Sequence, residues 1–190
     1  MYVMEKRTEI FLKALRDKNE EIRRAGAEAL EKFQLRTHLE TLQKKIDSGE
    51  MLDKIRAVYA LTDLKGPKPS ELLAKAVKDQ SEDVRAAAIR VLATSGDGHA
   101  LTMLVEALND SSTVVVRCAL DGLAKWSDQR LLGPFMKALK NTDPGVVEKA
   151  LEAIARIGDK RAEEAMFYFA AKGNEKMRAL AIKALGMMDN

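Results

Sequence analysis

Residue types that can catalyse a reaction or hold a metal ion are scarce in this chain and stand apart from one another. His38 and His99 are the only histidines and Cys118 is the only cysteine, and none has further ligands at a metal-binding spacing. The adjacent glutamates Glu20–Glu21 and Glu163–Glu164 would point in different directions on a helix, so neither pair can work as an acid and a base. The glycines are isolated and form no phosphate-binding loop. We therefore expect a protein that is not an enzyme and that uses no metal or cofactor.

Charged residues at regular spacing are the remaining candidates for function, because they can bind another macromolecule. A basic stripe could contact phosphates, and its members would be Lys13, Lys44, Lys75 and Lys137, with Arg16, Lys78 and Lys140 beside them. Three of the lysines follow a glutamate by four residues, which is the favoured orientation for ion pairs on a helix; these glutamates are Glu9, Glu40 and Glu71. We expect this face to be solvated and do not expect nucleic acid to be a partner.

The composition is typical of a soluble helical protein. The 190 residues include 32 basic and 29 acidic side chains and carry a net charge of +3, so long-range attraction to nucleic acid or to an anionic membrane should be weak. A single cysteine excludes an internal disulfide and suits a reducing compartment. No signal peptide and no membrane-spanning segment is recognisable in the sequence. We expect a cytoplasmic protein.

Apolar residues repeat with a period of 31 residues along the chain. One series of positions holds leucine or isoleucine at Leu30, Leu61, Leu92, Leu123, Ile154 and Leu185. A second series holds only small residues, at Gly26, Ala57, Ala88, Ala119, Ala150 and Ala181. Two further series, which begin at Phe11 and Leu15, are apolar in every copy. Six copies follow one another without an insertion, and we place them at residues 5–35, 36–66, 67–97, 98–128, 129–159 and 160–190.

Each copy has the pattern of two helices separated by a polar break. In the first copy, EIFLKALRD precedes the break DKNEE, and IRRAGAEALEKF follows with an apolar stripe. Ser81, Ser112 and Asp143 are suited to cap the second helices, and Gly96 and Gly158 are suited to end them. The small residues allow a neighbouring helix to approach closely. One pair of helices cannot bury its own apolar faces, so we expect the pairs to stack into a solenoid.

This pattern resembles the short HEAT-like repeat that is also named after the phycobilisome lyases. Its signature runs Leu-x-x-Ala-Leu-x-Asp, a polar turn, Val-Arg-x-x-Ala-x-x-x-Leu and Gly-Asp; the third copy supplies Leu73, Ala76, Val77, Asp79, Val84, Arg85, Ala88, Leu92, Gly96 and Asp97. The resemblance covers the whole chain. It implies an all-α fold, a right-handed α-solenoid of six two-helix repeats. It also implies a hydrogen-bonded ladder between helices, which would join Asp17 with Arg23, Asp79 with Arg85, and Asp110 with Arg117.

The resemblance also indicates a candidate binding surface, because second helices line the concave side in proteins of this kind. The positions expected to face outward there are Arg24, Glu28, Ile55, Tyr59, Ala86, Arg90, Arg117, Asp121, Glu148, Glu152, Ala179 and Lys183. The charges alternate in sign, with an apolar step at Ile55 and Tyr59. Tyrosine and arginine are enriched where proteins bind one another. The alternative is a solvated face whose charges pair locally.

Aromatic residues and the last segment carry further expectations. Trp126 lies in the series of Phe33, Leu64, Ile157 and Met188, so we expect it to pack at the seam between copies. Phe167, Tyr168 and Phe169 are expected to pack within the last copy. The apolar ending ALGMMDN predicts either association through this end or continuation in a longer protein. Without such association we expect a monomer.

The function that these observations favour is a non-catalytic scaffold that binds another protein on its concave face. The resemblance leaves a second hypothesis, a bilin lyase or chromophore chaperone, although no chromophore-specific motif is present. A HEAT-like DNA glycosylase is a third and less favoured hypothesis. Such an enzyme needs a strongly basic groove, whereas Asp121, Glu148 and Glu152 make the expected groove mixed in charge.

Overall fold

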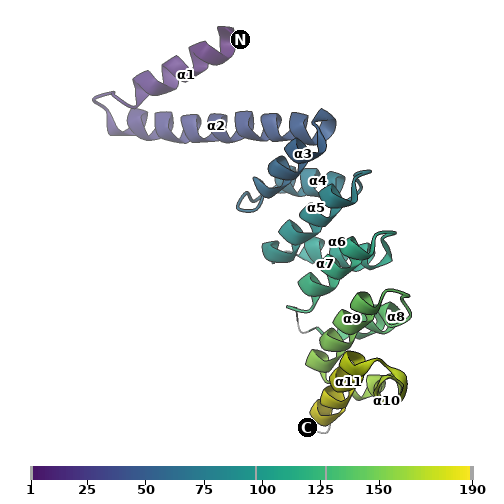
Figure 1. Ribbon diagram of the computed structural model, residues 1–190. Coiled ribbons are helices and arrows are strands. Elements are labelled where there is room, and N and C mark those ends of the chain that lie inside the picture. Colours follow the sequence, from purple (N-terminus) through teal and green to yellow (C-terminus); the bar gives the residue numbers. More distant parts are fainter. Residues whose placement is uncertain (1, 97, 127, 189–190) are drawn as a thin grey trace.

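The computed structural model describes residues 2–96, 98–126 and 128–188, and it is helical throughout (Figure 1). No strand occurs in these residues, which confirms the expected all-α class. The α-helices are α1 (Tyr2–Ala14), α2 (Glu20–Ser48), α3 (Met51–Tyr59), α4 (Pro67–Ala76), α5 (Glu82–Ser95), α6 (Gly98–Glu106), α7 (Thr113–Leu123), α8 (Leu132–Ala138), α9 (Pro144–Ile157), α10 (Glu163–Lys172) and α11 (Glu175–Met188). Short 3-10 helices adjoin three of them, at Ala107–Asn109, Gln129–Leu131 and Lys160–Ala162.

Two layers of helices run along most of the molecule. Helices α3, α5, α7, α9 and α11 pack directly on one another in sequence order, and α4, α6, α8 and α10 lie on the other side (Figure 1). Contacts between successive members of that other layer are few. The closer spacing puts α3, α5, α7, α9 and α11 on the inner side of the solenoid. We call these two layers, with the last part of α2, the rod.

The series of small residues lies where the expected stacking needs it. Ala57, Ala88, Ala119, Ala150 and Ala181 are all buried, and so is Gly26. A methyl group on Gly26 would come within 2.6 Å of the Cβ of Ala14, so α1 and α2 touch almost backbone to backbone.

The predicted capping residues all stand at helix ends, but not all of them make a capping hydrogen bond. Gly96 and Gly158 both have φ of 66°, the left-handed conformation expected for residues that end helices. Asp143 caps α9 by accepting a hydrogen bond from the backbone N–H of Val146. Ser81 and Ser112 stand at N-cap positions, but their side chains make no capping hydrogen bond. Instead, the backbone N–H groups of the two serines donate to the carboxylates of Asp79 and Asp110.

Helix α2 corrects the expected organisation of the first two copies. The second helix of the first copy and the first helix of the second copy are one continuous helix, and residues 35 and 36 lie inside it. The physical reason is that QLRTHL contains no glycine, proline or capping residue that would end a helix. As a result, α1 and the first half of α2 form a two-helix arm that projects from the end of the rod (Figure 1). We call this arm the hairpin.

The predictions made for the aromatic residues are partly confirmed and partly wrong. Trp126 is half-buried and packs against the core, as expected for a seam residue. Phe169 also packs against the core, but Phe167 and Tyr168 are exposed, so packing of these two residues within the last copy was a wrong prediction. They lie on the exposed side of α10, a helix that packs mainly on α11. None of the described helices is long and apolar enough to cross a membrane.

Candidate binding surface

The aspartates of the repeat signature close the turns between helices. Asp17, Asp79 and Asp110 each accept a hydrogen bond from the backbone N–H two residues later, at 2.8 to 2.9 Å. Asn141 makes the same bond to the N–H of Asp143. These side chains therefore shape the loops and are not available as ligand contacts.

The basic residues of the ladder join neighbouring units, which differs from the expected pairing. Arg85 donates two hydrogen bonds to the carboxylate of Asp110, each 2.8 Å long, and another to the backbone oxygen of Asp79. Lys54 occupies the equivalent position one unit earlier and donates to the carboxylate of Asp79 at 2.6 Å. The expected partner of Arg85 was Asp79 itself, but that carboxylate belongs to the preceding step of the ladder.

Of the other two expected pairs, Asp17 and Arg23 are joined through the backbone oxygen of Asp17, whereas no hydrogen bond between Asp110 and Arg117 occurs among the described residues. Arg23 donates to the backbone oxygens of Asp17 and Lys18. Arg117 donates to the backbone oxygen of Thr113 and lies 4.0 Å from the carboxylate of Asp143. A valine, Val116, occupies the position equivalent to Arg85, so Arg117 points from the wrong place on the helix to reach Asp110.

The electrostatics of the ladder follow from partial burial and pairing. Burial alone would raise the pKa of Asp110, but hydrogen bonds from Arg85 and from the backbone N–H of Ser112 outweigh it and lower the pKa. The same pairing raises the pKa of Arg85, mainly through the hydrogen bond to Asp110 and against the effect of burial. The side chains are only 14% and 12% exposed, so this ion pair is part of the structure.

Ion pairs between neighbouring units also account for part of the expected binding surface. Asp121 of α7 pairs with Lys149 of α9, and Glu148 of α9 accepts a hydrogen bond from Lys176 of α11 at 2.6 Å. The alternation in sign seen in the sequence is therefore local pairing for these residues. Glu152 is half-buried on the same helix as Glu148, and it contributes to the raised pKa of Lys176.

The candidate residues on α3 and α5 are not paired with opposite charges in this way. Burial would lower the pKa of Arg90, but the neighbouring Cys118 and Tyr59 outweigh this effect and raise it. Among the described residues, no carboxylate forms an ion pair with Arg90. Tyr59 is 45% exposed, and Ile55 is half-buried against the core. Leu52, which sequence analysis missed, is exposed on the same helix.

The spacing of the three α3 residues could have revealed this apolar step. Leu52, Ile55 and Tyr59 follow one another at i, i+3 and i+7, the spacing of a single helix face. The exposure of Leu52 itself could not be predicted from this spacing. We call Leu52, Ile55, Tyr59 and Arg90 the α3–α5 patch.

Two candidate residues lie elsewhere. Arg24 and Glu28 are on the hairpin, where they pair with each other at 3.5 Å, so they do not belong to the surface of the rod. Ile55, Tyr59, Arg90, Arg117, Asp121, Glu148, Glu152 and Lys183 all lie on the stacked helices α3, α5, α7, α9 and α11. The candidate surface is thus shorter than the sequence suggested.

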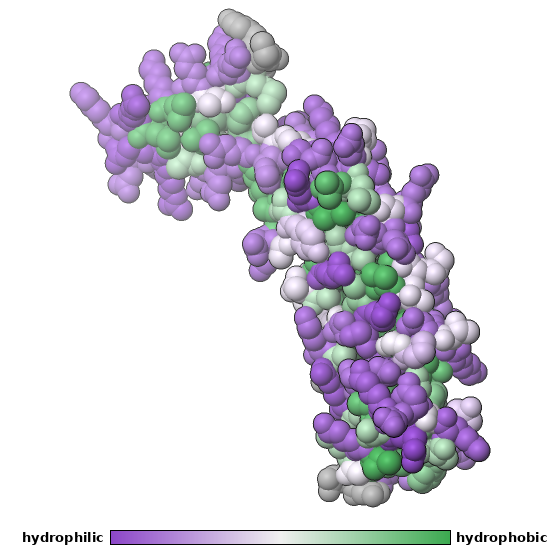
Figure 2. All heavy atoms as spheres, in the orientation of Figure 1, coloured by the Kyte–Doolittle hydropathy of each residue, from purple (hydrophilic) through white to green (hydrophobic). Residues whose placement is uncertain are grey.

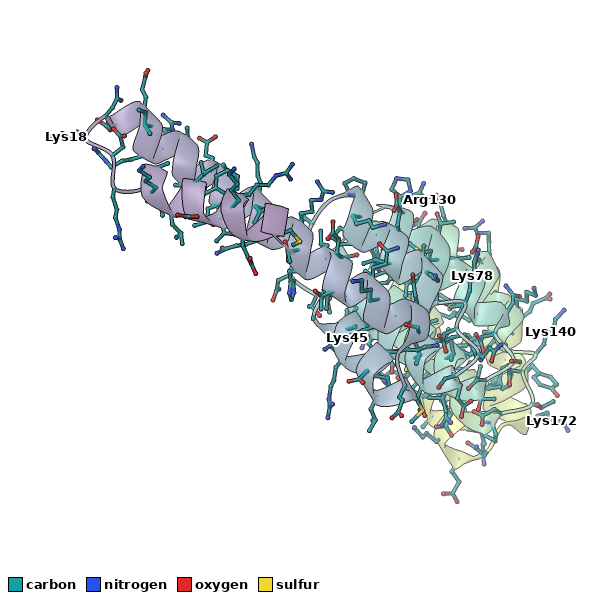
Figure 3. The ribbon with its side chains drawn as sticks, turned by 90° about the horizontal axis from the view of Figure 1, so that it is seen from above. Lys18, Lys45, Lys78, Arg130, Lys140 and Lys172 are labelled. Carbon is teal, nitrogen blue, oxygen red and sulfur yellow. The ribbon has the colours of Figure 1, made fainter. Side chains whose placement is uncertain are left out.

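The basic series of the first helices is also divided. Figure 3 shows two of its members, Lys78 and Lys140, on the same part of the rod. Lys75 and Lys137 are held by Asp47 and Asn109 of the preceding unit. A continuous basic stripe of the expected length does not form.

Comparison with known proteins agrees with the architecture. The sequence pattern of HEAT repeats matches residues 46–120 and 101–186. The chain belongs to the HEAT repeat family. Its HEAT repeats are matched from the end of α2 onward, so the hairpin lies outside the matched residues. Among curated protein sequences, none matches the chain.

Several solved structures share the HEAT-like fold. A designed armadillo repeat protein in complex with a peptide is 21% identical, with 94% of this chain and 98% of that chain covered and a TM-score of 0.58. YibA of Escherichia coli is 20% identical, with 100% and 68% covered and a TM-score of 0.61. The CpcE–CpcF phycocyanin lyase of Nostoc sp. PCC7120 is 19% identical, with 78% and 98% covered and a TM-score of 0.60. At these identities the likeness is one of fold.

Proposed function

We propose that this HEAT-repeat protein is a non-catalytic scaffold that binds a segment of another protein along its stacked inner helices. The observation that carries the proposal is the α3–α5 patch, in which a partly exposed tyrosine and an arginine without a carboxylate partner lie side by side. Fold likeness supports the same reading, since a designed armadillo repeat protein of this architecture has been solved with a peptide.

The chemistry of the patch defines the segment it would bind. Leu52 and Ile55 offer apolar area, and the ring of Tyr59 extends it. Arg90 can donate several hydrogen bonds to a carboxylate in a planar, bidentate arrangement. The expected ligand is therefore an extended segment that carries an acidic residue close to an apolar side chain.

The rest of the inner surface would contribute less to affinity. Asp121 and Glu148 already have lysine partners, and a ligand would have to exchange these ion pairs for its own. Exposed ion pairs add little stability, so the exchange is close to neutral. These charges can fix the direction of a bound segment without adding much binding energy.

The test is a capture experiment with matched variants. The immobilised protein is exposed to lysate, and bound proteins are identified for the wild type, Tyr59→Ala, Arg90→Glu and Arg24→Glu. We expect the first two variants to lose a protein that the wild type binds, because both remove hot-spot groups of the patch. Arg24→Glu reverses an equally exposed charge on the hairpin and should keep it. A partner that Arg90→Glu retains would contradict the proposal.

The likeness to a phycocyanin lyase makes pigment binding a second outcome worth measuring. That likeness is one of fold, and no residue of the α3–α5 patch is specific for a pigment. Co-production with a bilin, followed by an absorption spectrum, distinguishes the two functions. A coloured protein would favour the lyase or chaperone hypothesis, and a colourless one would leave the scaffold proposal in place.

A further inference from the structure

The hairpin exposes positions of the repeat that are buried in the third, fourth and fifth copies. Ile22 is 43% exposed, although its equivalents Val84, Val115 and Val146 are at most 1% exposed. Phe11 and Leu30 are only half-buried, whereas their equivalents in the third, fourth and fifth copies are buried. Ile10 and Leu12 on α1 are exposed as well. Figure 2 shows the resulting patch of apolar side chains on the hairpin.

Being at the end of the array does not account for this exposure. The last unit also has a neighbour on one side only, yet it buries Met166, Ala181, Ala184 and Met188. Within the described part of the hairpin, Gly26 alone is buried. Among the described helices, α2 is the only one against which α1 packs substantially. The hairpin therefore lacks a neighbouring unit that its apolar series is built to contact.

The complementary surface is open at the same end of the rod. Leu35 and Met51 are exposed, and Leu39 is half-buried. A groove of about 480 Å³ runs along α2 beside Leu35 and Leu39, and Lys68 of α4 also lines it. The second unit thus has space for a helix pair at the side where a first unit would stack.

The hairpin cannot reach this surface of its own chain while α2 stays continuous. Folding back would break helical hydrogen bonds around residues 34–37, in a segment without glycine or proline. Two local contacts strengthen the helix there: Thr37 donates to the backbone oxygen of Phe33 at 2.9 Å, and Arg36 donates to Glu40 at 3.0 Å. The occupant of this surface is therefore not the hairpin of the same chain.

We infer that two copies of this chain exchange hairpins, so that the hairpin of each copy packs on the second unit of the other. The contact needed is the unit-on-unit packing that the rod already makes repeatedly within one chain, and exchange would satisfy both open surfaces at once. A twofold arrangement of this kind is closed, which leaves no open surface for further copies. A straightened connection between two units that would otherwise stack is the expected feature of such an exchange.

The first test is the oligomeric state of the full chain, measured by sedimentation and light scattering over a wide range of concentration. We expect the wild type to be a dimer and Ile22→Glu to be a monomer with unchanged helicity, because Ile22 is exposed within the single chain. The control is Ile182→Glu on α11. Ile182 is also exposed, at 58%, but it lies far from the hairpin. This variant should remain a dimer.

The second test separates exchange from simple docking. The pair of changes Gln34→Gly and Arg36→Pro, both at exposed positions, breaks α2 where the first two copies meet. The hairpin can then fold back on its own chain, and we expect a compact monomer. A monomeric wild type, or a dimer that only Ile182→Glu dissociates, would overturn the inference. A hinge variant that stays dimeric would overturn the exchange as well. Arg90→Glu should leave the dimer intact, so failure of the proposed function does not affect this test.

Discussion

The hairpin and the rod carry the same repeat pattern but differ in how much of it they bury. Phe11 and Phe135 occupy equivalent positions; the first is half-buried and the second is 1% exposed. The two regions also differ in how their units are connected. Turns that contain Gly96 or Gly158 reverse the chain between units of the rod, whereas α2 continues straight from the first unit to the second. The apolar pattern decides which face of a helix can be buried, and the connection decides whether a neighbour is there to bury it.

The largest expected difference between the regions is in core truncation. Phe135→Ala should lower the free energy of unfolding by about 3–5 kcal/mol, since it leaves a cavity in a packed interior. Phe11→Ala at the equivalent position should cost about 1–2 kcal/mol, because a half-exposed ring loses less buried area and its edge-to-face contact with Phe33 is worth about 1 kcal/mol. Urea denaturation of both variants at low protein concentration measures the difference. Equal losses would show that the hairpin is packed as tightly as the rod.

A smaller difference is expected for the signature aspartates. Asp110→Ala removes a turn-closing acceptor and also leaves the guanidinium of Arg85 without its carboxylate, which should cost about 2 kcal/mol. Asp17→Ala removes only the hydrogen bond from the N–H of Asn19 and should cost about 0.5–1 kcal/mol. Thermal unfolding of the two variants ranks them. The two variants would lose equal stability if the ladder between units added none.

The smallest expected effect is the acid dependence of the ladder. The pKa values of Asp79 and Asp110 are lower in the folded chain than their ordinary value of 3.8. Their contribution to stability is therefore present above that value and is lost as the pH falls through the folded pKa. We expect the melting temperature to drop in this acid range, and to drop less in Asp110→Asn. An identical drop in the variant would mean that other carboxylates, such as Asp159 with its pKa of about 2, dominate the acid response.

Much of the rod follows from the sequence alone. The small series of Ala88 and the leucine series of Leu92 identify buried positions because each residue type recurs at one point of a fixed period. The glycines at helix ends could also be predicted, because few other residues adopt a left-handed conformation. The continuity of α2 was missed because the apolar series runs through residues 35 and 36 without a change of phase. The absence of a break in QLRTHL was the signal.

The candidate site was less predictable, because its contacts join different units. The family resemblance implied that Arg85 pairs with Asp79 of its own unit, but the carboxylate that Arg85 reaches is that of Asp110, which only stacking brings close. The partners of Asp121 and Glu148 also come from the following unit. By contrast, Tyr59 and Arg90 share one series and lie on adjacent helices, so their proximity was implied by the period itself.

The close approach of Gly26 and Ala14 has a mechanical consequence. Only the methyl group of Ala14 lies between the two backbones there, so α1 packs closely on α2. Helix α2 in turn enters the rod without an intervening loop. The hairpin is therefore joined to the rod by an unbroken helix, and a force applied at its tip would act on the packing of α2 against α3 and α4.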